Sequence, residues 1–195
     1  MTRSDAAENV QRLIRATRDA VAAEGPAVRV RTIADRAGVS LSTVYRHFPD
    51  KDGLVDAVSV ARWDTLSGLA TRAAPAADAL SVIVLLADRF SRTVTADAGF
   101  LESTGLQVGR SPSAIEEPKR RFDQALARWW AQAVRAGDLH PDADPRDLVQ
   151  LTGALRDPAR RAAQLGVLVR GVACRPERAT DLLRGHLRAA APDCT

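Results

Sequence analysis

The sequence contains very little cysteine and lacks any long hydrophobic run. Cys174 and Cys194 are its two cysteines in 195 residues. Two cysteines are too few for the disulfide framework of a small secreted domain, so we expect a reduced, cytoplasmic protein. The most hydrophobic run, residues 79–87, lies between Asp78 and Asp88 and is shorter than the roughly 20 residues that span a bilayer. The N-terminus also lacks the apolar core of a signal peptide, and we predict no membrane partner.

The residue spacings typical of catalytic and metal sites are also missing. The three histidines, His47, His140 and His186, lie far apart, and none has an acidic residue or cysteine at a typical ligand spacing. No C-x-x-C, H-E-x-x-H or G-x-S-x-G motif occurs, and no phosphate-binding Gly-Lys motif. We therefore expect no catalytic residue, metal or cofactor, and no enzyme. A site assembled from residues distant in the sequence is the open alternative.

Aromatic residues and lysine are also scarce, and both shortages are informative. Aromatics make up 4% of the chain, against 46% apolar and 27% charged residues, a balance that favours helices rich in Ala, Leu and Arg. We therefore predict an all-α fold. Lys51 and Lys119 are the only lysines, so arginine carries nearly all of the positive charge. The net charge of +4 favours an anionic partner, although a general arginine bias explains it equally well.

The segment 32–51 predicts two short helices joined by a turn. Ile33 and Ala37 share one face of the first helix, and Gly38 can take the left-handed conformation that ends a helix. Ser40 is suited to cap the second helix, because its hydroxyl can accept from backbone N–H groups two and three residues on. The Phe-Pro pair that follows ends this second helix.

The second of these helices has one apolar side and one polar side. At about 100° per residue, Val44 and Phe48 share the side that faces inward. The opposite side carries hydrogen-bonding residues, which are Ser42, Thr43 and Arg46, flanked by Tyr45 and His47. A helix of this kind, held across a partner helix by a short turn, is suited to enter a DNA major groove. The pattern predicts a helix-turn-helix.

These residues resemble the DNA-binding signature of TetR-type transcriptional regulators. The resemblance covers VRTIADRAGVS at residues 30–40, TVYRHFPDK at residues 43–51, and Leu54. It implies a DNA-binding domain at residues 1–52 and a helical ligand-binding and dimerisation domain at residues 53–195. The stretch Ala136–Asp142 is similar to C-terminal domains of that family.

The resemblance also implies a function and a set of DNA contacts. We expect a transcriptional regulator, in first place a repressor that a small effector releases from its operator. An activator of the same family, a helical protein-binding adaptor and an enzyme are the alternatives. The residues expected at base edges are Arg31, Ser42, Thr43 and Arg46, and those expected at phosphates are Tyr45, His47 and Lys51.

Two positions depart from the family pattern. Arg29 stands where many relatives place Ser or Thr to cap the first helix of the motif, and a guanidinium cannot accept a hydrogen bond. Gly53 lies in the first turn of the following helix, where it costs roughly 1 kcal/mol relative to Ala.

The rest of the chain reads as a series of further helices. We predict them from Asp5 to about Glu24, from Asp50 towards residue 74, at 78–96, from Glu117-Pro118 to Gly137, from Asp144 onwards, and from Pro176 to about Ala190. Residues 99–109 read as a short helix or an irregular segment. Pro158 interrupts the periodic pattern, which is compatible with one kinked helix or with two separate helices.

Two groups of apolar residues in the second domain are candidates for binding. Aromatic residues that can line a pocket for a small apolar effector are Trp63, Phe90, Phe100, Phe122 and Trp129, with plain core packing as the alternative. A homodimer interface is expected at Leu151, Leu155, Leu165, Leu168, Val169, Val172, Leu182, Leu183 and Leu187, with internal packing as the alternative. A two-fold dimer would bind an inverted-repeat operator in double-stranded DNA.

Overall fold

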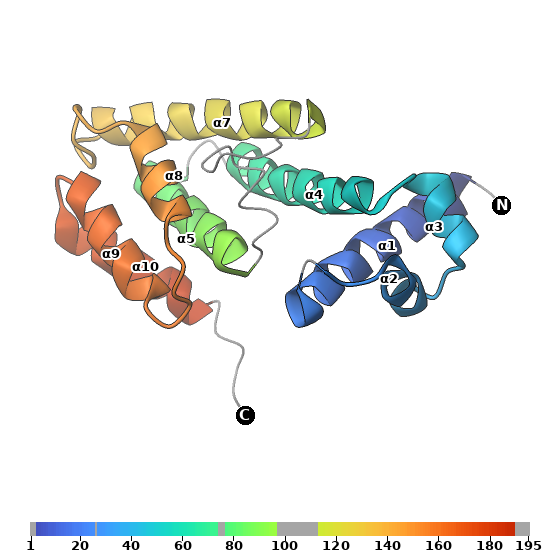
Figure 1. The fold of residues 1–195 in the computed structure, drawn as a ribbon. Helices are drawn as coiled ribbons and strands as arrows, with labels where there is room; N and C mark the ends of the chain where they lie inside the picture. The colour runs from blue at the N-terminus through green and yellow to red at the C-terminus, as the bar shows by residue number, and fades with distance from the viewer. Residues whose placement is uncertain (1–2, 26, 74–76, 97–112, 190–195) are drawn as a thin grey trace. The chain divides into compact units, whose positions relative to one another are not determined.

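The computed structural model describes residues 3–25, 27–73, 77–96 and 113–189, and these are predominantly helical (Figure 1). The α-helices are α1 (Arg3–Glu24), α2 (Val30–Ala37), α3 (Leu41–His47), α4 (Lys51–Arg72), α5 (Ala79–Ala96), α7 (Glu116–Arg135), α8 (Pro145–Gly153), α9 (Arg161–Val172) and α10 (Pro176–Ala189). A 3₁₀ turn, η1 (Ser113–Ile115), precedes α7. The all-α prediction is confirmed. The β-type pairing among the described residues is a single bridge between Leu139 and Ala173.

The chain packs as two compact units. One contains α1, α2, α3 and the first half of α4, and the other begins at Trp63 within α4 and contains α5 and α7 to α10. Helix α4 is therefore one continuous helix that contributes to both units. The predicted domain boundary after residue 52 stays a prediction.

Three helices and the start of a fourth enclose the core of the N-terminal unit. The buried side chains are Leu13, Ala16, Ala20, Val28, Ile33, Ala34, Ala37, Val44 and Leu54. Helix α1 supplies three of these residues, at intervals of three and four, so they form one apolar face over two turns, and α2 and α3 together supply four. Helix α1 thus provides the longest apolar stripe against which the two short helices pack.

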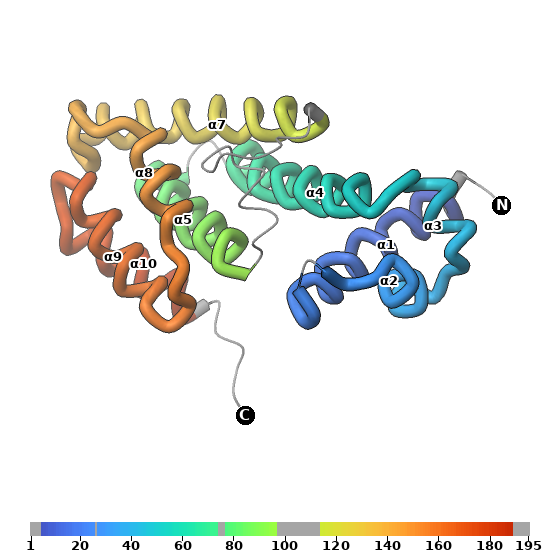
Figure 2. The backbone as a smooth tube through the Cα atoms, viewed as in Figure 1, coloured from blue at the N-terminus to red at the C-terminus, as the bar shows by residue number. Residues whose placement is uncertain are grey.

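The C-terminal unit is built around α5, which is buried on nearly all sides. Its buried apolar residues are Leu80, Val82, Ile83, Val84, Leu86, Ala87, Phe90 and Val94. A helix that is apolar nearly all round must be covered on every side, and α8, α9 and α10 all pack against α5. Figure 2 shows α9 and α10 as neighbouring segments of the tube, with α5 beside them.

The region around Pro158 contains two helices. Helix α8 ends at Gly153 and α9 begins at Arg161, so the first helix stops five residues before the proline. The carboxylate of Asp157 accepts hydrogen bonds from the backbone N–H groups of Ala159, at 2.9 Å, and Arg160. Pro158, which has no N–H to offer, occupies this turn at no cost in hydrogen bonds.

Two other expectations need comment. Helix α7 begins at Glu116, so Glu117 lies inside the helix and does not cap it, and Pro118 occupies the first turn, where its missing N–H has no intrahelical partner to lose. The segment 99–109, predicted as a short helix or an irregular segment, lies outside the described residues. Asp50 and Asp78 cap α4 and α5, since their carboxylates accept hydrogen bonds from the N–H groups of Gly53 and Ser81, both at 2.8 Å.

A buried carboxylate ties the start of α10 to the loop after α7. Asp138 is 2% exposed, accepts a hydrogen bond from the guanidinium group of Arg178 and forms an ion pair with Arg175 at 2.7 Å. Arg178 also pairs with Asp78, at 2.6 Å, just before α5. The hydrogen bond to Asp138 is the main cause that raises the pKa of Arg178 above its ordinary value, so this cation stays charged wherever the fold is stable.

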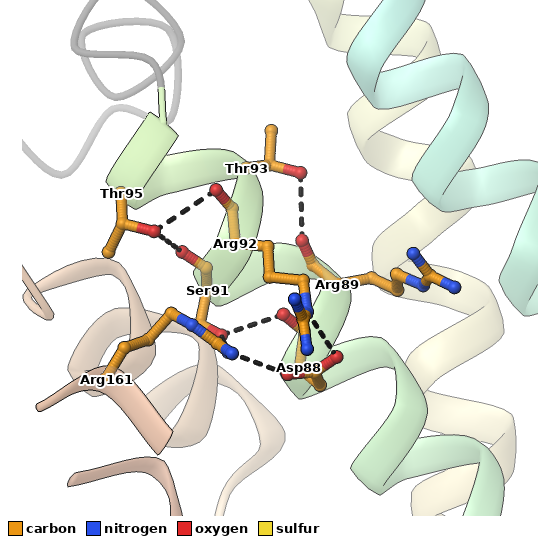
Figure 3. Close-up of polar contacts among 7 residues, drawn as sticks. All are labelled: Asp88, Arg89, Ser91, Arg92, Thr93, Thr95 and Arg161. Carbon is orange, nitrogen blue, oxygen red and sulfur yellow. Dashed lines mark hydrogen bonds and ion pairs between the residues drawn. The ribbon is translucent and has the colours of Figure 1, made fainter. Parts of the chain in front are cut away.

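An ion pair inside the C-terminal unit joins α5 to α9 (Figure 3). The guanidinium Nη1 of Arg161 lies 2.7 Å from the Asp88 carboxylate and 2.7 Å from the Ser91 hydroxyl, and both partners are buried. Arg92 pairs with the other oxygen of Asp88, at 2.8 Å. Because Arg161 is the first residue of α9, the pair fixes the start of that helix against the middle of α5.

We predict that removing one member of this pair is much more costly than replacing both. Asp88→Ala leaves the buried Arg161 guanidinium without its carboxylate, and the free energy of unfolding should fall by about 3–5 kcal/mol. The double replacement Asp88→Leu with Arg161→Met should cost far less, because no buried charge remains. Urea unfolding measures both changes.

The exposed pair between Glu117 and Arg120 provides the control, since both side chains are 59% exposed. Glu117→Ala should change stability by no more than about 1 kcal/mol. Equal losses in Asp88→Ala and Glu117→Ala would contradict the assignment of Asp88 as a structural anchor.

Candidate nucleic-acid interface

A glycine with positive φ creates the turn between α2 and α3. Gly38 has φ +65° and ψ +37°, and its N–H bonds to the carbonyl of Asp35 at 3.2 Å. The next N–H, of Val39, bonds to the carbonyl of Ala34 at 3.1 Å, which satisfies the end of α2. Since residues with a Cβ rarely adopt this conformation, the glycine predicted as the stop of the first helix has the expected role.

Ser40 caps α3 as predicted. Its Oγ accepts a hydrogen bond from the backbone N–H of Thr43 at 3.2 Å, and the hydroxyls of Ser42 and Thr43 each lie 2.9 Å from it. Arg29, at the equivalent position before α2, makes no side-chain cap, as its chemistry requires. The two helices of the motif therefore start differently, and only the second has a side-chain cap.

The two sides of α3 separate as the sequence pattern predicts. Val44 is fully buried, whereas Tyr45 is 51% exposed on a neighbouring part of the helix surface. Ser42 and Arg46 are exposed as well, and Thr43 is half-buried. The accessible side of α3 thus presents hydroxyl groups, a phenol and a guanidinium, which are the groups that contact base edges and phosphates.

Arg31 and Lys51 place further positive charge at the two ends of the motif. Arg31 is exposed near the start of α2, and Lys51 is half-buried at the start of α4. From Arg29 to Lys51 the sequence has five basic and two acidic residues. This local excess of positive charge suits a polyanionic partner.

His47 differs from the other predicted contacts. Its Nε2 atom is buried and has no hydrogen-bond partner among the described residues. Any phosphate contact by this side chain would therefore use Nδ1. The expected role of His47 stays a prediction, with the ring held half-buried at the C-terminal end of α3.

Arg12 on α1 lies beside the turn of the motif. One of its terminal nitrogens lies 4.0 Å from the position that a Cβ on Gly38 would occupy. The same guanidinium donates a hydrogen bond to the Asn9 side chain, and its buried Nε has no partner among the described residues. Arg12 thus packs beside the turn, and no spacing rule connects two residues so far apart in sequence.

The predicted effector residues are partly brought together. Trp63, Phe90 and Phe122 form a buried cluster with ring centroids 5.6–6.3 Å apart, and the rings of Phe90 and Phe122 are stacked. Trp129 is held elsewhere by a hydrogen bond from its Nε1 to the carbonyl of Ala70 at 2.8 Å. Phe100 lies outside the described residues.

A small apolar cavity adjoins this cluster. Its volume is about 10 Å³, and it lies between α5, α7 and α8. The lining residues are Ile83, Leu86, Ala87, Phe90, Phe122, Leu126, Leu148, Val149 and Thr152. Two of the predicted aromatic residues, Phe90 and Phe122, therefore line it, and Trp63 and Trp129 do not.

The residues predicted at a dimer interface divide into two groups. Leu155, Leu165, Val169 and Leu183 are buried within the chain's own core. The others remain partly or largely accessible, and they are Leu151, Leu168, Val172, Leu182 and Leu187. Val167, which the sequence reasoning omitted, is 61% exposed on α9 and is the most exposed large apolar residue described. The interface itself stays a prediction.

Two searches of the described residues gave negative results. No group of three or more His, Cys, Asp or Glu side chains is arranged to hold a metal ion among them. No described helix is both long and apolar enough to cross a membrane.

Comparisons with known proteins agree with the geometry of the motif. Residues 13–58 match the family described as bacterial regulatory proteins, tetR family. A TetR transcription regulatory protein from Mycobacterium vanbaalenii is 29% identical, with 88% of this chain and 98% of that chain covered and a TM-score of 0.68. Comparison with curated proteins finds no match.

Two further solved structures share the fold at lower identity. CprB from Streptomyces coelicolor, solved with its biological operator sequence, is 23% identical over 95% of this chain and 99% of that chain, with a TM-score of 0.69. A gamma-butyrolactone receptor described as an ArpA-like protein is 22% identical over 95% and 100% of the two chains, with a TM-score of 0.67.

The capped helix-turn-helix and the helical C-terminal unit define a DNA-binding transcriptional regulator, and not an enzyme. The N-terminal segment of this chain thus carries the DNA-binding domain of the TetR family, and the chain as a whole shares the fold of solved TetR-type regulators.

The cap of α3 leads to a prediction about stability. Ser40→Ala removes the side-chain acceptor for the Thr43 N–H and should lower the free energy of unfolding by about 0.5–2 kcal/mol. Arg29→Ser should have the opposite effect, because it adds an acceptor at a helix start that has none. Thermal unfolding followed by circular dichroism measures both variants.

Arg29→Ala serves as the control, because the arginine side chain makes no cap and the alanine side chain cannot make one. If Ser40→Ala is no less stable than Arg29→Ala, then the hydroxyl of Ser40 does not stabilise α3.

Proposed function

We propose that this protein represses transcription by binding an operator through α3 and that a small effector releases it from the DNA. The observation that carries the first half is the polarity of α3. Its apolar side is anchored by the buried Val44, and its hydrogen-bonding side is accessible. A helix so held can enter a major groove without exposing core residues.

The proposed contacts divide into two kinds. Arg31, Ser42, Thr43 and Arg46 approach base edges, and Arg46 is the residue best suited to a bidentate contact with guanine. Tyr45, His47 and Lys51 hold phosphates and position the helix. Exposure of Tyr45 supports its assignment, since a large aromatic side chain at 51% exposure contributes little to the core.

The effector half of the proposal rests on the C-terminal unit. Trp63, Phe90 and Phe122 form an apolar cluster there, and a small cavity adjoins two of them. The gamma-butyrolactone receptor has the same fold and is described by its small organic ligand, which supports an effector of that size class.

Helix α4 is the proposed mechanical link between effector and DNA. It begins at Lys51, directly after the DNA-binding motif, and carries Trp63 of the aromatic cluster on the same continuous helix. A ligand that displaces α4 at Trp63 would therefore alter the position of its Lys51 end. A coupling free energy of about 1–3 kcal/mol would change operator affinity by roughly 5- to 150-fold.

We predict that Lys51→Ala weakens binding to all DNA sequences alike. The loss of one phosphate contact should reduce the slope of log affinity against log salt by about 0.9. Arg46→Ala should instead cost roughly 1–3 kcal/mol and relax the preference at one base pair. Gel-shift titrations at several salt concentrations, on DNA upstream of this chain's own coding sequence, measure both effects.

Lys119→Ala is the matched control, because Lys119 is the only other lysine and lies on α7 beside Asp123. It should leave the salt slope unchanged. The proposed docking is wrong if Tyr45→Ala and Lys51→Ala both bind the upstream DNA as tightly as the unmodified protein.

We also propose that the protein acts as a two-fold dimer through the accessible apolar residues of α8, α9 and α10. Leu151 and Val167 are the most exposed apolar residues of these helices. The double variant Leu151→Glu with Val167→Glu should therefore dissociate, because it would bury two pairs of charges in the interface. Sedimentation at micromolar concentration should show a dimer for the unmodified protein and a monomer for the variant.

Ala127→Glu, at an exposed position of α7, should remain dimeric and shows whether added negative charge alone causes dissociation. A monomeric unmodified protein would refute the dimer, and so would a double variant that sediments as the unmodified protein does.

A further inference from the structure

Threonine hydroxyls in the helices of this protein usually bond to a backbone carbonyl in the preceding turn. Thr17 donates to the carbonyl of Leu13 at 2.7 Å, Thr71 to Ser67 at 2.8 Å, and Thr95 to Ser91 at 2.9 Å. This hydrogen bond is the ordinary way to satisfy the hydroxyl of a threonine that is buried on a helix.

Thr152 on α8 breaks this pattern. The residue is 1% exposed, and its Oγ1 has no hydrogen-bond partner among the described residues. An unsatisfied buried hydroxyl destabilises the folded state, and a valine methyl group in its place would not carry that cost. The Thr152 hydroxyl therefore lacks a hydrogen-bond partner within the described part of the chain, and a bound molecule would supply one.

The position of Thr152 indicates where that partner would lie. Thr152 lines the apolar cavity between α5, α7 and α8, and the other eight lining residues have apolar side chains. A water molecule is a poor occupant, because an ordered buried water needs about two to four polar partners and the lining side chains offer one. A ligand with an apolar body and a single hydrogen-bonding group matches the lining better.

We infer that Thr152 is the polar anchor of the effector site, and that the effector is a small apolar molecule with one hydroxyl or carbonyl group directed at the threonine Oγ1. This inference rests on the proposed function, which places an effector in the C-terminal unit. The stacked rings of Phe90 and Phe122 in the lining suit a flat apolar body. The polar group decides which ligands bind, because an analogue without it leaves the hydroxyl unpaired.

The present size of the cavity sets a condition on binding. A volume of about 10 Å³ holds no more than one water molecule, so a ligand must open the site. Val149 is the one lining residue that is only half-buried, and it lies on the nine-residue helix α8 together with Thr152. Ligand entry should therefore displace α8 from α5 and carry the anchor with it.

The first test concerns the unliganded protein. Thr152→Val removes an unpaired hydroxyl at nearly constant shape and should raise the melting temperature by about 2–4 °C in scanning calorimetry. Thr17→Val is the matched control, since Thr17 is equally buried and its hydroxyl is paired, and it should lower the melting temperature. A fall in both variants would overturn the inference, because the Thr152 hydroxyl would then be satisfied.

The second test uses phenol and toluene, which differ by a hydroxyl in place of a methyl group. Binding is measured by titration calorimetry on the unmodified protein and on Thr152→Val. Phenol should bind the variant about 2- to 10-fold more weakly, as expected for one lost hydrogen bond, and toluene should bind the two proteins alike. Equal changes for both probes, or binding of neither at millimolar concentration, would overturn the inference.

A third measurement separates this inference from the proposed function. DNA affinity is titrated with and without saturating phenol, and the effector proposal requires weaker operator binding in its presence. Phenol that binds through Thr152 without changing DNA affinity would refute the release mechanism and leave the anchor established. Phenol that releases DNA equally from Thr152→Val would refute the anchor and leave the release mechanism intact.

Discussion

A helix of seven residues cannot form by itself in water, and the DNA-binding half of this protein depends on overcoming that limit. Isolated helices shorter than about 12–15 residues are marginal even with good helix formers. Helix α3 therefore exists because Ser40 caps its first turn and because Val44 is fully buried in a core that it shares with residues of α1, α2 and α4. The left-handed Gly38 sets the direction in which this short helix leaves α2. Every DNA contact proposed for α3 depends on these three local conditions.

The C-terminal unit solves a different problem, which is how to bury polar groups beside an almost wholly apolar helix. Asp88 and Ser91 on α5 are satisfied by Arg161 of α9, and Asp138 by two arginines. These pairings fix where α9 and α10 begin, because hydrogen bonds to buried charges are directional and apolar contacts are not. Thr152 is the contrasting case, a buried hydroxyl without a partner among the described residues. The unit thus combines rigid, paired polar anchors with one unpaired group at its cavity.

The two units differ in how much each must change its conformation to bind its proposed partner. The motif around α3 is small and its contacts are local, so it can bind DNA as a rigid unit. The cavity in the C-terminal unit is nearly filled, so it can accept a ligand only by moving the elements around it. Helix α4 contributes to both units as one helix, which makes it the natural route for coupling. The physical basis of the proposed regulation is therefore a cavity that must open and a continuous helix, α4, whose Trp63 packs against two of the residues that line this cavity.

The sequence by itself determined the helix-turn-helix almost completely, since caps, the left-handed glycine, the proline stop and the two-sided pattern of α3 are all local signals within about twenty residues. It also determined the all-α class and the burial of α5, which follow from composition and periodicity.

Only the tertiary structure decided which distant residues meet. Asp88 and Arg161 are paired although far apart in the chain, Arg12 packs beside Gly38, and Trp63 joins Phe90 and Phe122 while Trp129 bonds to Ala70 instead. The tertiary structure likewise showed which apolar residues of the last three helices are buried in the chain's own core. Periodicity states which face of a helix is apolar, but the partner of that face depends on how whole helices pack, and one sequence pattern is compatible with many packings.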